Sequence, residues 1–454
     1  MEVIIELNEA TKGKFSNINL VFTDLVGVEQ KVPLFLRNFV NAYDLTGDIT
    51  SIKFDLFLVS ALVYGVDNLL DRRYYSNDGW ARELKVIFPV YHLDIWHGQE
   101  RLLEDALKFL TGDYWEIGFV QNTITPMYLM KGRRWKKYIR RFNVNKIKTT
   151  SLFSGGLDSL IGVIDELESL NNDEEILLVS HFDFKSPGPS RDQEILFAKL
   201  KLQYQKKINN NWIQTKLALS RTTLNGDTFQ VEGNYRSRSF FFIGLGCYLS
   251  PSNNLIVPEN GTISINYPLT PSRVSSLSTR TTHPFVIDKL QNLIDNLGID
   301  VKLKNPYNFD TKGEMVKNCS NYDFLVDISE NSTSCGKPGH NSSWVNKNTN
   351  HCGVCMPCIY RRASLNKAQL DNQIYGRDIT QPLTRNNYVD LPALIHYLKK
   401  DIDLEQMKRD ILINGSVPFE DLEEYAEMVL RSKNEVLQLF KDKGNNFIKT
   451  ELGV

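Results

Sequence analysis

Two patterns of hydrophobic and polar positions divide the chain. In its first third, short apolar runs at 3–7, 18–22 and 84–90 are bounded by polar residues, which predicts strands. The longer apolar stretch at 54–70 is typical of a helix. These elements follow no regular alternation, so we expect residues 1–145 to form a small α+β domain.

From residue 149 onward, strand-like and helix-like patterns alternate. The expected elements are a strand at 150–153, a helix at 157–167, a strand at 175–182, a helix at 193–204, and strands at 254–257 and 300–303. A strand-helix-strand series favours parallel strands joined by crossover helices. The predicted fold class is therefore α/β, with a parallel sheet and crossover helices.

The last part of the chain is helical in pattern. Leu422, Tyr425 and Val429 recur at the spacing of one helix face, and Val436 and Phe440 continue the series. The expected organisation has three parts: an N-terminal domain at 1–145, an α/β domain at 146–370 and a helical extension at 371–454.

Composition favours a soluble globular protein, because 42% of the 454 residues are hydrophobic and 24% are charged. The longest nearly apolar run, at 240–249, falls far short of the roughly 18 residues that suggest a membrane span. The segment 1–7 carries two acids and lacks the basic start and apolar stretch of a secretory signal, so we expect a cytoplasmic protein with no membrane partner. The formal net charge of −1 gives no support to general polyanion binding.

One local charge pattern departs from this balance. Residues 131–148 hold nine basic and no acidic residues, interleaved with Trp135, Tyr138 and Phe142. Such a run can contact nucleic acid through phosphates and stacking. Basic runs are more often solvated linkers or helix faces, so a nucleic-acid partner is not the favoured interpretation.

The sharpest motif is a glycine-rich turn between the strand and the helix that open the α/β pattern. It consists of Ser154, Gly155, Gly156, Leu157, Asp158 and Ser159. Two glycines let the backbone turn tightly and approach an anion, and the first turn of the helix directs unpaired N–H groups at it. The serines add hydroxyl donors, and Asp158 can hold a magnesium ion that neutralises phosphate. No Gly-Lys-Ser/Thr follows, which excludes a Walker A loop, and we expect this turn to bind phosphate.

This string resembles the signature Ser-Gly-Gly-x-Asp-Ser of the PP-loop family, the N-type ATP pyrophosphatases. The resemblance implies ATP and Mg2+ as cofactors and cleavage of ATP between its α and β phosphates. It implies that pyrophosphate lies in the loop while AMP is transferred to a substrate carbonyl or carboxylate.

Four of the six cysteines crowd into one segment: Cys335, Cys352, Cys355 and Cys358. Two overlapping Cys-x-x-Cys spacings and a more distant fourth thiol supply the soft ligands of a closed tetrahedral zinc site. Redox chemistry and an iron–sulfur cluster are the alternatives. Four thiolates leave no coordination position for water, so we expect a structural Zn2+.

Two histidines and two cysteines lie outside this set. His340 and His351 are near enough in sequence to be spare zinc ligands, although we expect solvent-exposed or supporting roles for them. Cys247 lies in an apolar helical stretch and is expected in the core, whereas Cys319 has no functional interpretation.

The glycine-rich turn followed by the cysteine set resembles the QueC family, the 7-cyano-7-deazaguanine synthases, over residues 149–370. The string Thr311-Lys312-Gly313-Glu314-Met315 resembles the Thr-Lys-x-Glu helix start of that family. The resemblance implies that Lys312 takes part in catalysis together with Asp158.

Two further positions match the same family. Arg238 occupies the place of an arginine that opens an apolar helix, and Phe182 and Asp183 match the region that meets the adenosine of ATP. The resemblance implies that Arg238 is catalytic and that Phe182 and Asp183 lie beside ATP. In that family, 7-carboxy-7-deazaguanine is adenylated on its carboxylate, attacked by ammonia to give an amide, and dehydrated through a second adenylation to the nitrile.

The chain departs from the family near the substrate. The segment 278–285, Ser-Thr-Arg-Thr-Thr-His-Pro-Phe, stands where the family has Tyr-Pro-Asp-Cys-Arg. Arg280 and His283 are therefore candidates to recognise a different substrate or acceptor, and Glu259 and Asn260, just after a strand, are candidates to pair with a purine-like edge. For each of these four residues, a purely structural role has about the same weight as the functional one.

The chain is also longer than ordinary QueC proteins, by residues 1–145 and 371–454. This longer form resembles QueC-like proteins of bacterial anti-phage defence operons, the Qat type and those of some CBASS systems. The resemblance implies that an amine on a partner protein captures the acyl adenylate and that the added parts dock this partner. The alternatives are nitrile synthesis with ammonia for queuosine-type modification, and a non-catalytic nucleotide-binding scaffold in a defence complex.

Overall fold

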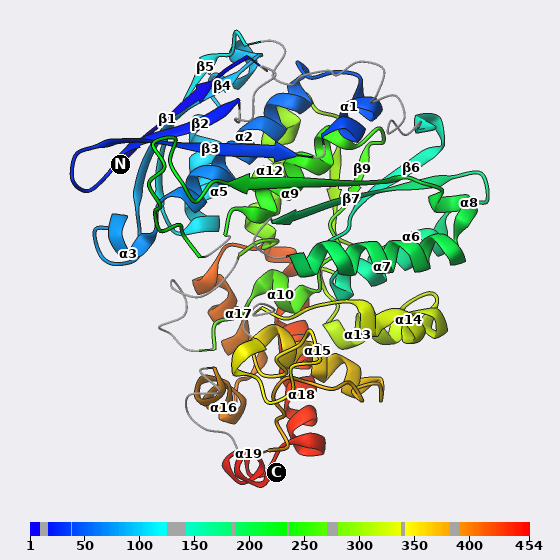
Figure 1. Ribbon diagram of the computed structural model, residues 1–454. Coiled ribbons are helices and arrows are strands. Elements are labelled where there is room, and N and C mark those ends of the chain that lie inside the picture. The colour runs from blue at the N-terminus through cyan, green and yellow to red at the C-terminus, as the bar shows by residue number, and fades with distance from the viewer. Residues whose placement is uncertain are drawn as a thin grey trace.

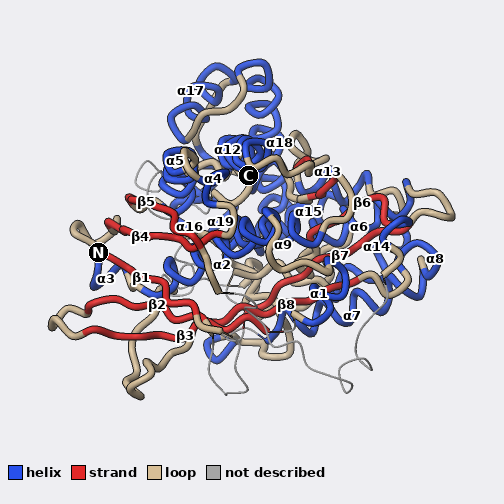
Figure 2. The backbone as a smooth tube through the Cα atoms, turned by 90° about the horizontal axis from the view of Figure 1, so that it is seen from above, coloured by secondary structure: helices blue, strands red, loops and turns tan. Residues whose placement is uncertain are grey.

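A mixed sheet of ten strands forms the centre of the computed structural model (Figure 1). The structure describes residues 1–9, 17–37, 39–124, 142–183, 187–233, 236–269, 280–336, 341–381 and 390–454. The strands are β1 (Glu2–Leu7), β2 (Ile18–Thr23), β3 (Glu29–Arg37), β4 (Glu83–Val90), β5 (Tyr114–Gln121), β6 (Ile147–Leu152), β7 (Glu175–Asp183), β8 (Trp212–Leu219), β9 (Asn254–Ile256) and β10 (Lys302–Lys304). Their order is β10-β9-β6-β7-β8-β3-β2-β1-β4-β5, and Figure 2 shows them crossing the molecule as one band.

Helices cover this sheet and extend beyond it. In the first third they are α1 (Val40–Thr46), α2 (Ile52–Leu69), α3 (Arg72–Tyr75), α4 (Leu93–Trp96) and α5 (Glu100–Thr111). In the middle they are α6 (Leu157–Ser169), α7 (Pro187–Gln203), α8 (Gln205–Ile208), α9 (Arg238–Leu249), α10 (Gly261–Ile265), α12 (Pro284–Asn296), α13 (Lys312–Asn318), α14 (Tyr322–Ile328) and α15 (Met356–Lys367). Near the C-terminus they are α16 (Leu391–Lys399), α17 (Leu404–Asn414), α18 (Leu422–Lys443) and α19 (Asn446–Leu452).

Strand direction divides the sheet into two parallel blocks. β10, β9, β6, β7 and β8 run parallel to one another, and so do β1, β4 and β5. β3 and β2 join the blocks through antiparallel pairs, with Leu34 of β3 opposite Leu219 of β8. The expected α/β class is confirmed, and the sheet continues from one block to the other across residue 145.

The crossover helices create a topological switch point beside β6. Helices α6 and α7 cover one face, with Leu160 and Leu196 in a common core, whereas α9 returns the chain from β8 to β9 over the other face. Figure 1 shows α2 and α9 above β7 and α6 and α7 below it. β6 thus lies between β7 and β9, and chain connections leave it in opposite directions. Ligands of open α/β sheets bind in the crevice at such a point, outside the carboxyl ends of the strands.

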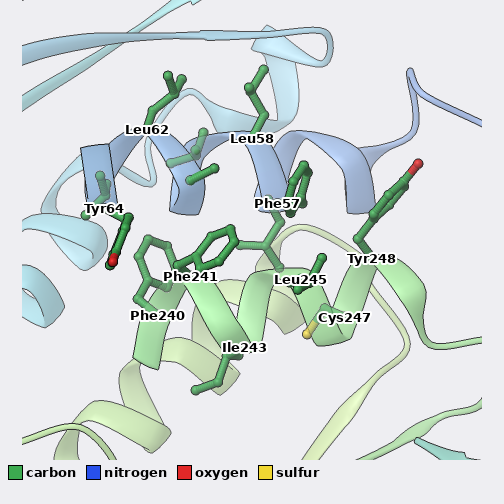
Figure 3. Close-up of a cluster of buried hydrophobic side chains, with 14 of the residues drawn as sticks. Phe57, Leu58, Leu62, Tyr64, Phe240, Phe241, Ile243, Leu245, Cys247 and Tyr248 are labelled. Carbon is green, nitrogen blue, oxygen red and sulfur yellow. The ribbon is translucent and has the colours of Figure 1, made fainter. Parts of the chain in front are cut away.

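The N-terminal part shares a core with the first block, because α2 packs against α9 (Figure 3). The two helices approach closely at Gly244, where an added Cβ would lie 2.2 Å from the Ser60 hydroxyl oxygen. The rings of Phe57 and Tyr248 stack across the same interface, with centroids 5.4 Å apart. Residues 1–145 and the following part are therefore joined by one sheet and one core, and their division into two domains stays a sequence-based prediction.

A buried ionic cluster anchors the start of α9 to α2. The guanidinium of Arg82, which is fully buried, donates to Asp67 and Asp113 at 2.6 Å each. Burial raises the pKa of Asp67, but the charges of Arg82 and Arg72 outweigh it and hold that pKa below its ordinary value. The ionised Asp67 also accepts hydrogen bonds from the Ser237 hydroxyl at 2.7 Å and the Ser237 N–H at 3.1 Å. The residue that precedes α9 is therefore held in place by the N-terminal part.

The last helices pack around the cysteine-bearing segment, at the end of the molecule away from β1–β5 (Figure 1). Leu439 and Phe440 of α18 share a core with Ile359 of α15. Over the part of the chain that the structure describes, no helix is long and apolar enough to cross a membrane.

Most expected elements are confirmed, although the helix expected at 193–204 begins at Pro187, and the missed elements include the strands β3, β5 and β8 and the helices α5 and α12. β8 carries Gln214 and Thr215 among apolar residues, and Thr215 is buried, so its alternation is hidden in the sequence. Residues 131–141 of the basic run lie outside the described residues, and its end forms a short 3₁₀ turn leading into β6.

Candidate functional site

The glycine-rich turn connects the carboxyl end of β6 to α6. Gly155 has φ +84°, and a Cβ at this position would lie 3.1 Å from Gln193 Cγ, so glycine is required for conformation and space. The hydroxyls of Ser154 and Ser159 lie 3.0 Å apart, and Ser154 accepts the Gly156 N–H at 3.2 Å. No side chain caps α6, so its N-terminus presents N–H groups and a positive dipole end at the switch point.

Asp158, in the first turn of α6, is held at one oxygen only. Its Oδ2 accepts from Lys312 Nζ at 2.6 Å and from Asn260 Nδ2 at 3.0 Å. Burial raises its pKa, but the Lys312 charge and these hydrogen bonds outweigh burial and hold the pKa below its ordinary value. The other oxygen, Oδ1, is buried and receives no hydrogen bond from an N–H or hydroxyl of the described residues.

Glu259 completes this cluster from the segment after β9. Its pKa lies well above the ordinary value, first because of burial and then because of the adjacent Asp158 charge, so the carboxyl keeps its proton beside Asp158. Asn260 Nδ2 also donates to Glu259 Oε1 at 3.2 Å. Two facing carboxyl groups with a buried, unpaired oxygen form the oxygen-rich site that Mg2+ prefers beside phosphates. The site therefore fits a divalent cation, which would replace the proton that the raised pKa keeps on Glu259.

Lys312 reaches this cluster because it is the first residue of α13, and α13 begins beside the cluster. Thr311 caps α13 in a capping box with Glu314, which sets the direction of the first turn. Glu435 of α18 accepts hydrogen bonds from the Thr311 hydroxyl and from the Gly313 N–H, the latter at 3.3 Å. Helix α18 therefore fixes the segment that carries Lys312, and the sequence alone did not reveal this link.

The carboxyl end of β7 lies next to the turn. Gln193 Nε2 donates to the Ser154 carbonyl at 3.0 Å and to the His181 carbonyl at 3.2 Å, so one side chain connects the two strand ends. Phe182 is partly buried with Lys216 Nζ 5.5 Å from its ring centre. Asp183 ends β7, and its side chain lies outside the described residues.

The four candidate substrate residues separate into two pairs. Glu259 and Asn260 meet Asp158, which gives them a place in the cation cluster. The Arg280 guanidinium lies 4.2 Å from the ring centre of Phe109, and His283 Nδ1 accepts the Phe285 N–H at the start of α12. Burial, then the Arg280 charge, lowers the pKa of His283 to about 3, so this imidazole is neutral.

The four cysteines converge as expected. Their sulfur atoms all lie within 4.8 Å of one another, with Cys352 and Cys358 3.8 Å apart and Cys335 and Cys355 4.0 Å apart. Zinc–sulfur bonds of about 2.3 Å give a tetrahedron with edges of about 3.8 Å. Gly353 has φ +82°, and a Cβ there would lie 2.3 Å from the Arg377 carbonyl oxygen. The sulfur positions therefore fit a closed zinc site.

The remaining described histidines and cysteines do not enlarge this set. His351 Nε2 accepts the Ser334 N–H at 3.3 Å, so it supports the segment before Cys335. His340 lies outside the described residues. Cys247 is buried in the α9 core, as expected, and Cys319 is buried and free.

A short segment links the cysteine site to the glycine-rich turn. The Thr333 N–H donates to the Gly155 carbonyl at 3.1 Å. Arg361, which is fully buried, donates to the Ser332 hydroxyl and to the Ser329 carbonyl at 2.9 Å each. Arg361 follows Cys358 by one helical turn, and this spacing was the available sequence signal for its role.

Comparison with known proteins adds no relative, because no protein-family model, no curated protein and no solved structure matches this chain. What these residues can do follows from their chemistry. An uncapped helix N-terminus, a buried lysine and a pair of carboxyl groups at a switch point are groups whose chemistry suits a phosphate ester and a divalent cation.

Proposed function

We propose that this chain is a QueC-like ATP pyrophosphatase with a PP-loop fold, which adenylates a carboxylate of the 7-carboxy-7-deazaguanine type and transfers the acyl group to an amine. The observation that carries the proposal is the meeting of Asp158, Lys312 and Glu259 at the N-terminus of α6. A phosphate turn alone would serve a binding protein. A buried cation and a paired-carboxyl site beside it serve a reaction in which negative charge moves between phosphate groups.

Different residues of the site bind different parts of ATP. The N–H groups of the turn and the hydroxyls of Ser154 and Ser159 bind the departing pyrophosphate. Lys312 stabilises the charge that develops on the leaving oxygen, and Asp158 and Glu259 are the residues that would hold Mg2+. When bound, this ion neutralises the phosphates and so favours attack by an anion.

The chemistry has two balanced steps. A carboxylate oxygen of the substrate attacks the α-phosphorus of ATP, the bond from that phosphorus to the bridging oxygen breaks, and pyrophosphate leaves. The amine nitrogen then attacks the acyl carbon, the bond to the AMP oxygen breaks, and AMP leaves as the nitrogen loses a proton. The products are an amide, AMP and pyrophosphate.

The substrate class and the setting rest on the motif resemblance. An amine on a partner protein in anti-phage defence agrees with the extra length at 1–145 and 371–454, which nitrile synthesis does not need. The cysteine site holds zinc in a structural role, because four thiolates leave no open position, and it braces the phosphate turn through Thr333 and Arg361.

The test is release of pyrophosphate and AMP from magnesium ATP with 7-carboxy-7-deazaguanine, run alone, with ammonium, and with proteins encoded by neighbouring genes, followed by intact mass. AMP together with a mass increase on a neighbouring protein is the expected result. A small-molecule nitrile in the ammonium reaction would assign nitrile synthesis instead. ATP binding without AMP under every condition would leave the scaffold function.

Matched variants make this test specific. Asp158→Asn should abolish AMP formation and retain zinc, because it removes the cation-holding charge but not the shape. Asp173→Asn, an exposed carboxylate after α6, should behave as the unchanged protein. Unchanged turnover in Asp158→Asn would overturn the assigned role of the turn.

A further inference from the structure

The start of α9 combines polar groups that the described part of the protein leaves without partners. Arg238, the first residue of the helix, is half-buried and makes no hydrogen bond or ion pair with a described residue. The next residue, Ser239, has a buried hydroxyl oxygen with no hydrogen-bond partner. The Arg238 guanidinium and the Ser239 hydroxyl can therefore donate hydrogen bonds to a ligand.

His181 of β7 lies against the same turn. Its side chain is fully buried, and neither ring nitrogen has a hydrogen-bond partner. The ring meets Phe241 of α9 edge to face, with centroids 4.7 Å apart, and meets Tyr64 of α2 at 5.9 Å. Buried polar groups in native proteins almost always have a partner, so an unpaired imidazole here points to a group that is bound during function.

The start of α9 already gives one donor to a carboxylate, since Asp67 accepts the Ser237 N–H at 3.1 Å, and the next N–H groups of its first turn remain for a ligand. Ser237, at the N-cap, makes no capping hydrogen bond, because its hydroxyl donates to Asp67 of α2. The first turn contains no acidic residue. An α-helix N-terminus of this kind presents N–H groups and a positive dipole end, both of which favour negative charge.

This site lies across the sheet from the phosphate turn. Helices α6 and α9 cover opposite faces of the sheet, yet Gln193 connects the Ser154 carbonyl at one site to the His181 carbonyl at the other. In phosphoryl transfer, the entering and leaving oxygens stand roughly in line on opposite sides of the phosphorus. With pyrophosphate on the α6 side, the entering carboxylate belongs on the α9 side.

We propose that Arg238, Ser239, His181 and the first turn of α9 form an anion subsite that binds the carboxylate of the substrate to be adenylated. This deepens the proposed function and rests on it. The planar guanidinium matches the two oxygens of a carboxylate, and the imidazole and hydroxyl add donors. Burial, then the Arg238 charge, holds the pKa of His181 well below its ordinary value, so the imidazole binds as a neutral donor. The contact of Asp67 with Ser237 gives the N-terminal part a role in building this subsite.

A binding experiment tests the subsite without catalysis. Benzoate and its neutral analogue benzamide are titrated into the full-length protein, and the histidine Cε1–Hε1 signals are followed by NMR, with His181 assigned by its loss in His181→Phe. Benzoate should shift the His181 signal and benzamide should not. Arg238→Gln should remove the shift, and Arg221→Gln, a change at an exposed arginine, should keep it. Equal shifts with both probes, no shift, or a shift retained in Arg238→Gln would overturn the subsite.

Kinetics separate this proposal from the proposed function. In ATP–pyrophosphate exchange, Arg238→Gln should raise the KM for 7-carboxy-7-deazaguanine by roughly tenfold or more, as expected for a lost hydrogen bond to a charged group, and leave the KM for ATP within about twofold. An equal rise in the KM for ATP would place Arg238 at the phosphates and overturn the subsite. If the unchanged protein shows no exchange, the proposed function fails, and the benzoate titration still decides whether the anion subsite exists.

Discussion

Lys312 Nζ lies 2.6 Å from Asp158 Oδ2, although 154 positions separate the two residues in the chain. The pair is nearly buried, with 8% and 12% of the two side chains exposed. A buried ion pair is maintained only when further hydrogen bonds satisfy it, and Asn260 supplies one to the same oxygen. The pair therefore joins α13 to the glycine-rich turn, and the Lys312 charge helps to hold the pKa of Asp158 below its ordinary value.

Lys312→Met should leave Asp158 as an uncompensated buried charge. We expect the free energy of unfolding to fall by about 3–5 kcal/mol and ATP–pyrophosphate exchange to be lost. Because the loss comes from the unpaired carboxylate, Asp158→Asn added to Lys312→Met should restore part of the stability and none of the activity. Urea unfolding of both variants measures this, and a double variant no more stable than Lys312→Met would contradict the pairing.

Glu259→Gln should weaken the cation site and change the pH dependence of stability. In the folded protein the pKa of Glu259 is raised from its ordinary value near 4.5, so its contribution to stability is complete below that value and is lost as pH rises through the folded pKa. In magnesium-free buffer, the variant should therefore gain stability relative to the unchanged protein between pH 5 and pH 8, by at most about 1.4 kcal/mol per pH unit. Asp158 does not contribute over this range, since its lowered pKa acts at more acidic pH.

Thermal unfolding against pH, with and without Mg2+, measures this difference. Mg2+ should stabilise the unchanged protein increasingly as pH rises and stabilise Glu259→Gln much less, because only the carboxylate binds the ion. A stability difference that does not vary with pH would show that Glu259 is ionised in the folded protein and would remove it from the cluster.

Cys355→Ala should lose zinc and a large part of the stability, because the free energy of structural zinc binding is free energy of folding. Cys319→Ala removes another buried thiol and should keep the zinc. Metal analysis and thermal unfolding of the two variants test this assignment. Full zinc content in Cys355→Ala would exclude Cys355 as a ligand.

Arg361→Gln should weaken nucleotide binding at a distance. It removes donors from the Ser332 hydroxyl and the Ser329 carbonyl, which costs about 1–3 kcal/mol for each buried group left unpaired, and it loosens the segment that holds Gly155. Arg362→Gln, next to it in α15, breaks contacts to Asp371 instead and serves as the control. Both variants should lower stability and keep zinc, but only Arg361→Gln should raise the Kd for an ATP analogue. Equal Kd values in the two variants would refute the link.

Gly244→Ala tests the interface between the N-terminal part and the α/β part. The added methyl would lie 2.2 Å from the Ser60 hydroxyl oxygen, so we expect a loss of roughly 1–3 kcal/mol through overpacking. Ser60→Gly in the same chain removes the opposing atoms and should recover much of that loss. Denaturant titrations of the single and double variants measure the coupling, and purely additive effects would contradict the close approach of α2 and α9.

Short sequence patterns by themselves determined several local features of this protein. The apolar spacing from Leu157 to Leu167 predicted α6, and the two glycines before it predicted a turn able to approach an anion. The positions of Cys352, Cys355 and Cys358 predicted a metal site, which the convergence of the four sulfur atoms supports. The helix and the tight turn are confirmed because turn geometry and helix periodicity act over a few residues, within the reach of a sequence pattern.

Only the tertiary structure decided which distant segments meet. Glu259 and Asn260 were candidates to pair with a purine-like edge, and the strand order also places them against Asp158, a contact that the sequence did not indicate. The sequence analysis gave no role to Arg361 or Gln193. It also did not predict one sheet across residue 145, because the hydrophobic pattern differs before and after that residue. A hydrophobic pattern tells which face of an element is buried but not which partner buries it. That choice depends on strand order and crossover direction, which arise only when the whole chain packs.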